Sequence, residues 1–302
     1  MGPVRGQLMV PVSSIALRCA FVAAGIVALA STLPSGTSAQ TRMKREPELI
    51  YVPTPQNIVD KMLEVAKVTK DDYVFDLGSG DGRIPITAAA RYGARGFGVD
   101  INPKLIEEAR ANAKAAGVSD RVEFRRQDLF QTSVREATVV GLYLFVWANV
   151  KLRPRLISEL RPGSRIVAHD FPIGDDWKPD VEEDVENRTV YLWYVPAQVA
   201  GKWHLLGGPP GLTVQLQQQF QKIEGTAEVD GRAVPLQSAS LRGAEIEFTV
   251  ALEAGKPLLF RGKVDGDTME ARADAGGAVT GWSAVRTSPA PATSPAVIRS
   301  RG

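Results

Sequence analysis

Apolar residues between positions 54 and 169 follow two periodicities that alternate along the chain. Short β-branched and aromatic runs, such as Tyr73-Val74-Phe75, have the composition of buried strands. Between them, apolar residues recur at helical spacing, as in Ile58 and Met62, and Thr54 is the expected N-cap of the first helix. This alternation predicts an α/β fold whose parallel sheet has right-handed crossover connections and is covered on both faces. Expected helices span 55–68, 84–92, 103–117 and 155–160, and expected strands span 73–76, 96–100, 122–125, 138–144 and 164–169.

The pattern changes after about residue 196. Apolar and polar residues then alternate, as in Leu212, Val214 and Leu216, which predicts strands. Asp230-Gly231 and Asp265-Gly266 have the composition of hairpin turns. We therefore expect a C-terminal antiparallel β domain, a small barrel or sandwich whose first and last strands meet. The expected organisation is a leader over 1–39, an α/β domain over 40–196, the β domain over 197–286 and a disordered tail over 287–302.

Three glycines at alternate positions follow the strand that ends at Asp76, in the order Gly78, Gly80 and Gly82. Glycines at a strand-to-helix turn supply positive φ and let a ligand approach the backbone closely. The spacing is G-x-G-x-G and no lysine follows, so it fits neither a dinucleotide fingerprint nor a phosphate-binding P-loop. The carboxylates of Asp76 and Asp81 would repel a pyrophosphate and suit a ligand that carries an ammonium group.

Other polar residues follow neighbouring strands of the expected sheet. Ligands of such sheets lie beyond the carboxyl ends of the strands, where Asp100, Asp128 and residues 144–149 also fall. Asp100 is placed to accept hydrogen bonds from a ligand, or to cap the strand end. Asp128 is likewise placed to accept a hydrogen bond from a ligand, or to cap a helix.

The glycine turn and Asp100 together resemble the first two motifs of class I S-adenosylmethionine-dependent methyltransferases. With Tyr51-Val52-Pro53-Thr54-Pro55, Asn102-Pro103 and Phe171-Pro172, the chain from about 48 to 180 resembles the mitochondrial protein-lysine methyltransferases of ATP synthase c-subunit and adenine nucleotide translocator, and their bacterial relatives. The resemblance implies a Rossmann-like sheet, S-adenosylmethionine as the cofactor and a protein lysine as the substrate. It also implies that Asp100 accepts hydrogen bonds from the ribose diol, and that Asp128 accepts one from the adenine amino group, with Leu129 and Phe130 packing the ring. The implied cofactor-binding residues are Tyr51, Thr54, Asp76, Gly78, Ser79, Gly80, Asp81, Gly82, Asp100, Ile101, Asp128 and Leu129.

The chain departs from that family in two places. The ribose-binding acid is glutamate in the family and Asp100 here, and residues 145–149 differ from the family's sequence. Methyl transfer to an amine needs alignment and a neutral acceptor, and a desolvating aromatic surface lowers an amine pKa without a dedicated base. The expected catalytic residues are Tyr143, Phe145, Trp147 and Asn149. Core packing is the alternative for Phe145 and Trp147, and His169 is either a base or a structural residue.

The composition bears on partners and location. The 302 residues include 36 basic and 34 acidic ones, and no basic stripe indicates a nucleic-acid partner. Arg5 and Arg18 precede an apolar stretch, and Thr37-Ser38-Ala39 offers a cleavage site, so residues 1–39 have the features of an export signal. We expect a periplasmic or secreted protein if the signal is cleaved. The alternative is an inner-membrane anchor with the catalytic domain in the cytoplasm, where the methyl donor is made.

Few side chains are suited to metal ligation. Cys19 is the only cysteine and lies in the leader, and the histidines are His169 and His204. We therefore expect no metal site and a monomer. Three functions stay open: methylation of a protein lysine, a binding protein that acts through the β domain, and methylation of a small molecule.

Overall fold

The computed structural model describes residues 51–206, 211–229, 231–251, 257–271 and 281–289. The leader, the hairpin residue Asp230 and residues 290–302 lie outside this part of the chain. Residues Glu48–Gly302 form one compact unit. No helix in the described ranges is long and apolar enough to span a membrane.

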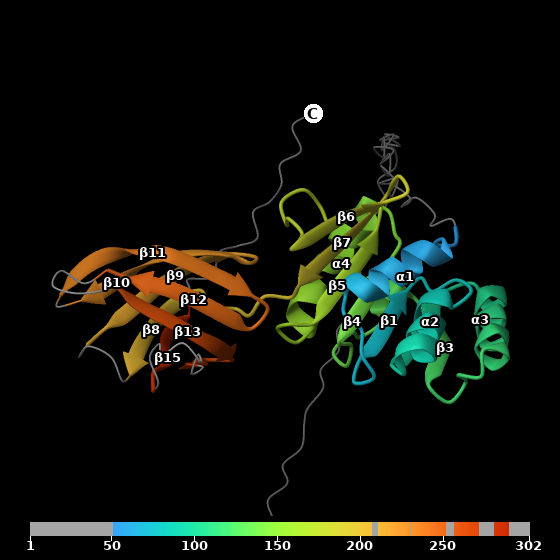
Figure 1. Ribbon diagram of the computed structural model, residues 1–302, viewed down its shortest axis with the longest axis horizontal. Coiled ribbons are helices and arrows are strands. Elements are labelled where there is room, and N and C mark those ends of the chain that lie inside the picture. Colours follow the sequence, from blue (N-terminus) through green and yellow to red (C-terminus); the bar gives the residue numbers. More distant parts are fainter. Residues whose placement is uncertain (1–50, 207–210, 230, 252–256, 272–280, 290–302) are drawn as a thin grey trace, which may run out of the picture. The chain divides into compact units, whose positions relative to one another are not determined.

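A seven-stranded sheet forms the first half of this unit, in the order β3-β2-β1-β4-β5-β7-β6 (Figure 1). The first five strands pair in parallel, as the sequence predicts. Two strands that the sequence analysis did not predict extend the sheet, and β7 pairs antiparallel with β5 and with β6. The strands are β1 Tyr73–Leu77, β2 Arg95–Asp100, β3 Val122–Arg126, β4 Val139–Leu142, β5 Arg165–His169, β6 Val181–Val185 and β7 Arg188–Tyr194.

Helices cover both faces of this sheet. On one face Val74 packs with Ile58, Met62 and other side chains of α1 and α2. On the other face Phe75 packs in a cluster with Leu152 and other side chains of α4. The alternation of Val74 and Phe75 follows from the period of two along a strand. The helices are α1 Gln56–Val65, α2 Arg83–Tyr92, α3 Pro103–Ala115 and α4 Val146–Glu159.

Helix α4 begins nine residues before its expected start at Arg155. Its first turn therefore contains Trp147 and Asn149, which we expected in a loop after the fourth strand. The sequence predicts too late a start for this helix because Pro154 lies inside it, and a proline usually indicates a helix break. Packing of Leu152 and Leu156 against the sheet maintains the helix.

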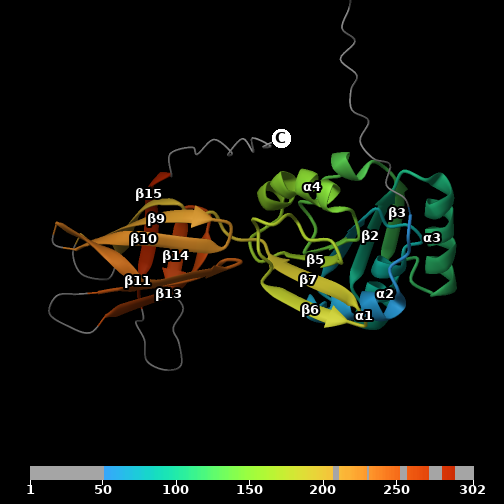
Figure 2. The same cartoon turned by 90° about the horizontal axis from the view of Figure 1, so that it is seen from above.

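The second sheet is a closed antiparallel barrel, as the fold prediction allowed (Figure 2). Closure comes from β15 pairing with β8, which confirms that the first and last strands meet. Trp203 and Phe248 are among the side chains that fill its core. Strand β15 extends to Pro289, so residues 287–289 are not part of a disordered tail. The strands are β8 Gly201–Leu206, β9 Thr213–Gln219, β10 Lys222–Val229, β11 Arg232–Arg242, β12 Glu245–Val250, β13 Leu258–Asp265, β14 Thr268–Ala271 and β15 Ser283–Pro289.

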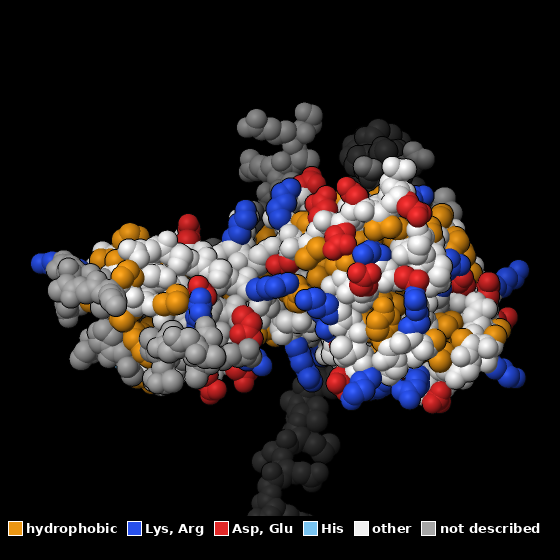
Figure 3. Space-filling model, viewed as in Figure 1, with side chains coloured by type: hydrophobic (Ala, Val, Ile, Leu, Met, Phe, Trp, Pro, Cys, Tyr) orange, Lys and Arg blue, Asp and Glu red, His pale blue; other side chains and the backbone are white. Residues whose placement is uncertain are grey.

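Acidic, basic and apolar side chains are interspersed on the face shown in Figure 3. Opposite charges also pair closely on the described surface, as in Arg91 with Asp60 and Arg261 with Glu247. Such mixing fits the balanced composition.

Candidate active site

The turn after β1 is built by glycines in left-handed conformations. Gly78, Gly80 and Gly82 have φ of 92°, 52° and 80°, and Gly82 is the N-cap of α2. The backbone N–H groups of Gly78 and Ser79 both donate to the carbonyl of Val99 at 2.9 Å, which fastens the turn to β2. Positive φ at three alternate positions is the reason for glycine at each of them.

Tyr51 lies over this turn. A Cβ on Gly80 would overlap the Tyr51 ring, so the close approach of the ring depends on glycine. Arg83 links the two segments: its Nη1 donates to the Thr54 carbonyl at 2.7 Å, and its Nε donates to Asp81 at 2.9 Å. Arg83 was not among the expected site residues, although it directly follows the glycine turn.

Thr54 does not cap α1. Pro55 is the N-cap residue, and no side chain caps that end of the helix. The Thr54 side chain is buried, and its hydroxyl lies 3.4 Å from Nδ1 of His169 at the end of β5. The chain preceding α1 is thereby held between the glycine turn and β5.

Asp76 is buried inside β1 rather than beyond its end. Burial raises the pKa of its carboxyl group to about 8, and the charges of Asp100 and Asp81 act in the same direction. A cationic partner favours the ionised form of a carboxyl group, and we expect this stabilisation to matter most where burial disfavours ionisation. For Asp81, burial opposes ionisation, but the hydrogen bonds and charge of Arg83 outweigh it and lower the pKa.

Asp100 connects the glycine turn to the start of α3. Its Oδ2 accepts a hydrogen bond from Gly80 N at 3.2 Å, and its Oδ1 accepts one from Asn102 N at 2.8 Å. Asn102 in turn accepts from Lys104 N and caps α3, which begins at Pro103 as expected. Ile101 is 66% exposed beside Asp100, a high exposure for an apolar side chain that suits contact with a ligand.

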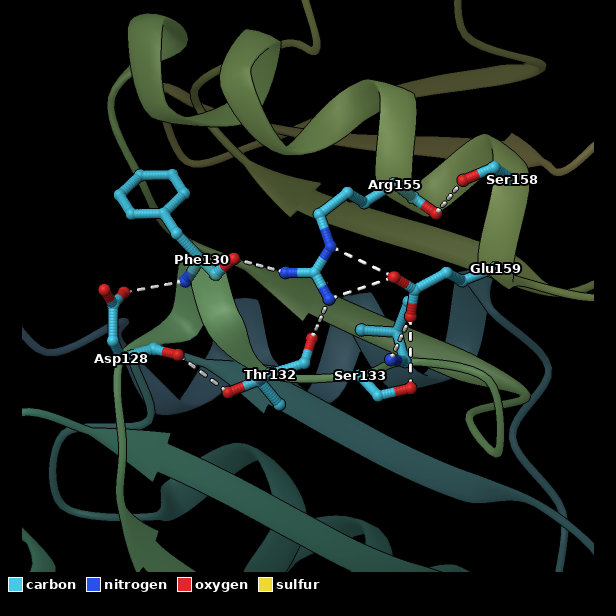
Figure 4. A network of polar contacts seen from close by, with 8 residues as sticks. Asp128, Phe130, Thr132, Ser133, Arg155, Ser158 and Glu159 are labelled. Atoms are coloured by element: carbon cyan, nitrogen blue, oxygen red, sulfur yellow. Dashed lines mark hydrogen bonds and ion pairs between the residues drawn. The ribbon is translucent and has the colours of Figure 1, made fainter. Parts of the chain in front are cut away.

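Asp128 opens the segment that follows β3, residues 128–134 (Figure 4). Its Oδ1 accepts from Phe130 N at 2.8 Å and caps the short helix Leu129–Gln131, which is the capping alternative that the sequence left open. Leu129 is buried, as expected for a residue that packs the floor of the site.

Arg155 and Glu159 of α4 hold this segment in place (Figure 4). The Arg155 guanidinium donates to the carbonyls of Phe130 and Thr132, and its Nη2 pairs with Glu159 at 3.0 Å. Glu159 also accepts from Ser133 Oγ and from Val134 N. Burial opposes ionisation of Glu159, but these donors and Arg155 lower its pKa. No local pattern in the sequence indicates that Arg155 and Glu159 bind residues 130–134, because about 25 residues separate the helix from this segment.

Four rings form an aromatic cluster where β4 and β5 end: Tyr143, Phe145, His169 and Phe171. Tyr143 stacks on His169 at 4.0 Å between centroids and on Phe171 at 5.9 Å, and Phe145 meets Phe171 edge to face. Burial lowers the pKa of His169 although the neighbouring Asp170 opposes the shift, so the ring is neutral near pH 7. The rings form an apolar, uncharged surface of the kind that keeps an amine neutral.

The side chains of Asn149 and Trp147 are less exposed to solvent than their expected catalytic roles suggested. Asn149 is fully buried, and its Nδ2 donates to the carbonyls of Leu144 at 3.1 Å and Phe171 at 2.9 Å. It therefore joins the two segments that carry the aromatic cluster. Trp147 packs 6.1 Å from Phe130 against the core of the sheet, which is the core-packing alternative.

The residues around the glycine turn suit S-adenosylmethionine. Ser79 Oγ is buried without a hydrogen-bond partner among the described residues, and Asp76 is a buried acid suited to a cation. Asp76 and the glycine turn would hold the amino-acid end, Asp100 the ribose, and Ile101 and Leu129 the adenine. When bound, the cofactor supplies a methyl group on a sulfonium. The chain's own residues bind, orient and exclude water.

Comparison with known proteins agrees with this geometry. Residues 76–181 match the family described as ANTKMT methyltransferase domain. A protein-lysine N-methyltransferase of Saccharolobus islandicus is 44% identical over 158 residues, which are 51% of this chain and 98% of the relative. The chain belongs to this methyltransferase family. It is therefore an S-adenosylmethionine-dependent enzyme, which sets aside the interpretation as a binding protein.

Two further similarities concern a curated relative and a solved structure. The methyltransferase is 30% identical to the ATP synthase c-subunit lysine N-methyltransferase of Mus musculus over 199 residues, 65% of this chain and 79% of the relative. It is 54% identical to a solved structure described as an RNA methyltransferase of Salinibacter ruber in complex with S-adenosyl-L-homocysteine. That match covers 49% of this chain and 96% of the other, with a TM-score of 0.48.

Proposed function

We propose that the methyltransferase transfers a methyl group to the ε-amino group of a lysine on a protein, and that this protein belongs to the membrane or envelope. Relatives that are 44% and 30% identical carry names that specify lysine as the acceptor. The observation that carries the proposal is the aromatic cluster next to the glycine turn. Phe145, Tyr143 and Phe171 are exposed or half-buried and offer an acceptor amine an apolar surface, and Tyr143 stacks on the fully buried His169.

The chemistry needs little from the protein beyond this surface. The amine lone pair forms the new N–C bond as the C–S bond of the donor breaks, and the amine must be neutral to do so. Desolvation lowers the pKa of a lysine ammonium, so its proton can leave to solvent before transfer. Phe145 is 40% exposed and can contact the stem of the entering side chain.

The exposed apolar side chains support an apolar acceptor protein. Among the described residues of the α/β half, the exposed large hydrophobic ones all lie near the glycine turn or after β2 and β4. Exposed apolar side chains gathered in this way are typical of a protein or membrane contact. They are Val52, Phe145 and Val146, together with Tyr51 and Ile101, which are also expected to contact the cofactor.

Methyl transfer from labelled S-adenosylmethionine tests the proposal. The acceptors are a peptide with lysine among leucines and alanines, a twin with serines and glutamines, a twin with arginine in place of lysine, and transfer RNA. We expect strong labelling of the first, weaker labelling of the second and none of the others. Labelling of RNA, or of the arginine twin as strongly as the lysine peptide, would refute lysine as the acceptor, and equal labelling of the first two would refute the preference for an apolar protein.

A further inference from the structure

The turn between β9 and β10 of the barrel inserts an aromatic ring into the α/β half of the same compact unit. Phe220 stacks on Trp177 with 5.3 Å between ring centroids and 11° between planes. The guanidinium of Arg153, from α4, lies 5.3 Å from the centroid of the Phe220 ring. Beside it, Gln221 Nε2 donates to the Lys178 carbonyl at 2.6 Å. Two adjacent residues of the barrel thus hold one short stretch of chain.

The turn itself is firmly held. Phe220 has a φ of 54°, a left-handed conformation that costs energy for a bulky residue and persists only where its surroundings compensate. Gln218 supplies that support: its Nε2 donates to the carbonyls of Phe220 and Ala197, both at 2.7 Å. Its Oε1 accepts from Val199 N at 2.7 Å. The side chain of Gln218 therefore fixes Phe220 to the segment that enters the barrel.

The stretch that receives Phe220 is the β5–β6 connection, residues 170–180. This connection contains no helix or strand, and besides the barrel turn it is held by Trp193, whose Nε1 donates to the Trp177 carbonyl at 2.9 Å, and by backbone hydrogen bonds at its two ends. Trp177 is fully buried in it, and Arg153 Nη1 donates to the Ile173 carbonyl at 3.3 Å. Phe171, near its start, belongs to the aromatic cluster and accepts a hydrogen bond from Asn149. One end of the connection therefore forms the acceptor surface, and the other end lies under Phe220.

We propose that the barrel is a positioning module for the acceptor site, with Phe220 and Gln221 as its positioning residues. They hold Trp177 and Lys178, and through the β5–β6 connection they keep Phe171 against Tyr143 and Phe145. The proposal rests on the proposed function, because it assigns the aromatic cluster to the acceptor. It gives the barrel a role in catalysis that needs no ligand of its own. No hydrogen bond or ring contact among the described residues joins Phe220 or Gln221 to the glycine turn or to residues 128–134, so we expect variants of these two residues to leave cofactor binding unchanged.

Hydrogen exchange and titration on the full chain test this proposal. The variants are Phe220→Ala, the milder Gln221→Ala, and the control Val285→Ala, which removes an apolar barrel side chain that is 41% exposed. In Phe220→Ala we expect amides of residues 171–178 to exchange about tenfold faster. Exchange in residues 128–134 and the affinity for S-adenosylhomocysteine stay unchanged. Transfer to the apolar lysine peptide falls by about tenfold, because the acceptor surface is misplaced. Gln221→Ala acts in the same direction, and Val285→Ala has no effect.

Unchanged exchange of residues 171–178 in both turn variants would overturn the proposal. Faster exchange with an unchanged transfer rate would overturn it as well, because the order of the connection would then not matter to the acceptor. If the unmodified chain labels no lysine peptide, the proposed function fails. In that case, hydrogen exchange still shows whether the barrel turn orders residues 171–178. The titration still shows whether cofactor affinity stays unchanged in the variants.

Discussion

Asp76 is a carboxyl group whose titration is changed by its burial. It is 4% exposed, and its pKa is raised to about 8 by burial, with Asp100 and Asp81 adding to the effect. The native state therefore binds a proton that the unfolded chain has already lost above its ordinary pKa of 3.8. Stability from this group is greatest at low pH and falls as pH rises towards 8.

Asp76→Asn provides the test of this shift. Asparagine resembles the protonated acid and does not titrate, so the ligand-free variant should lack the loss of stability that the unmodified chain shows between about pH 4 and pH 8. Urea unfolding at several pH values measures the difference between the two chains. Parallel pH profiles would contradict the raised pKa of Asp76.

At the scale of elements, α4 connects the two halves of the active site. Its first turn carries Asn149, which holds the aromatic cluster, and its last turns carry Arg155 and Glu159, which hold residues 128–134. A long helix is stiff enough to relate the two sites to each other. The segment with Asp128 and Leu129 is thus ordered by a side chain that is not itself expected to touch the cofactor.

Arg155→Met should weaken cofactor binding by this indirect route. The variant removes the donors to Phe130 and Thr132 and leaves the partly buried Glu159 with fewer partners, which we expect to cost about 1–3 kcal/mol of stability. Loosening of residues 128–134 should then lower the affinity for S-adenosylhomocysteine. Calorimetric titration measures the affinity, and Arg135→Ala, an exposed arginine in the same region, serves as the control. Equal affinities of Arg155→Met and Arg135→Ala would refute the positioning role.

Local signals in the sequence predicted much of this architecture. Helices α2 and α3 lie within one or two residues of their expected ranges, 84–92 and 103–117. The hairpin of β6 and β7 was missed, because Glu182, Glu183 and Asp184 make an edge strand that lacks an apolar run. Its turn has positive φ at Glu186 and Asn187, and Asn187 was the available clue.

Contacts distant in sequence could not be predicted in this way. The pairing of Thr54 with His169 and of Arg155 with Phe130 depends on which strands become neighbours, and no single-sequence pattern encodes it. The expected cofactor residues follow the carboxyl ends of the parallel strands or precede α1, whereas Asn149 is buried in α4 and Trp147 is half-buried there. The error arose from placing the start of that helix too late.

At the scale of the whole molecule, the chain combines a methyltransferase sheet with a closed barrel in one compact unit. The β7 strand ends at Tyr194 and β8 begins at Gly201, so the change of sheet falls where the sequence pattern changes. The boundaries of the leader stay a prediction. So does its consequence that a cleaved chain would be separated from the cytoplasmic source of its methyl donor.

Processing of the leader decides between export and anchoring. Small residues at 37–39 predict cleavage before Gln40. Mass spectrometry of the full chain produced in a bacterium should therefore find a mature N-terminus at Gln40 in the periplasmic fraction. An intact N-terminus in the membrane fraction would support the anchored alternative with the catalytic domain in the cytoplasm.

The most direct test of the account is calorimetric titration of S-adenosylhomocysteine into the full chain and two glycine variants. Gly80→Ala and Gly117→Ala each place a side chain at positive φ, 52° and 69°, but only the first meets the Tyr51 ring, whereas the second meets open space. We expect binding by the unmodified chain and by Gly117→Ala, and a loss of at least about tenfold in Gly80→Ala. Undiminished binding by a folded Gly80→Ala chain would show that the cofactor does not bind at the glycine turn.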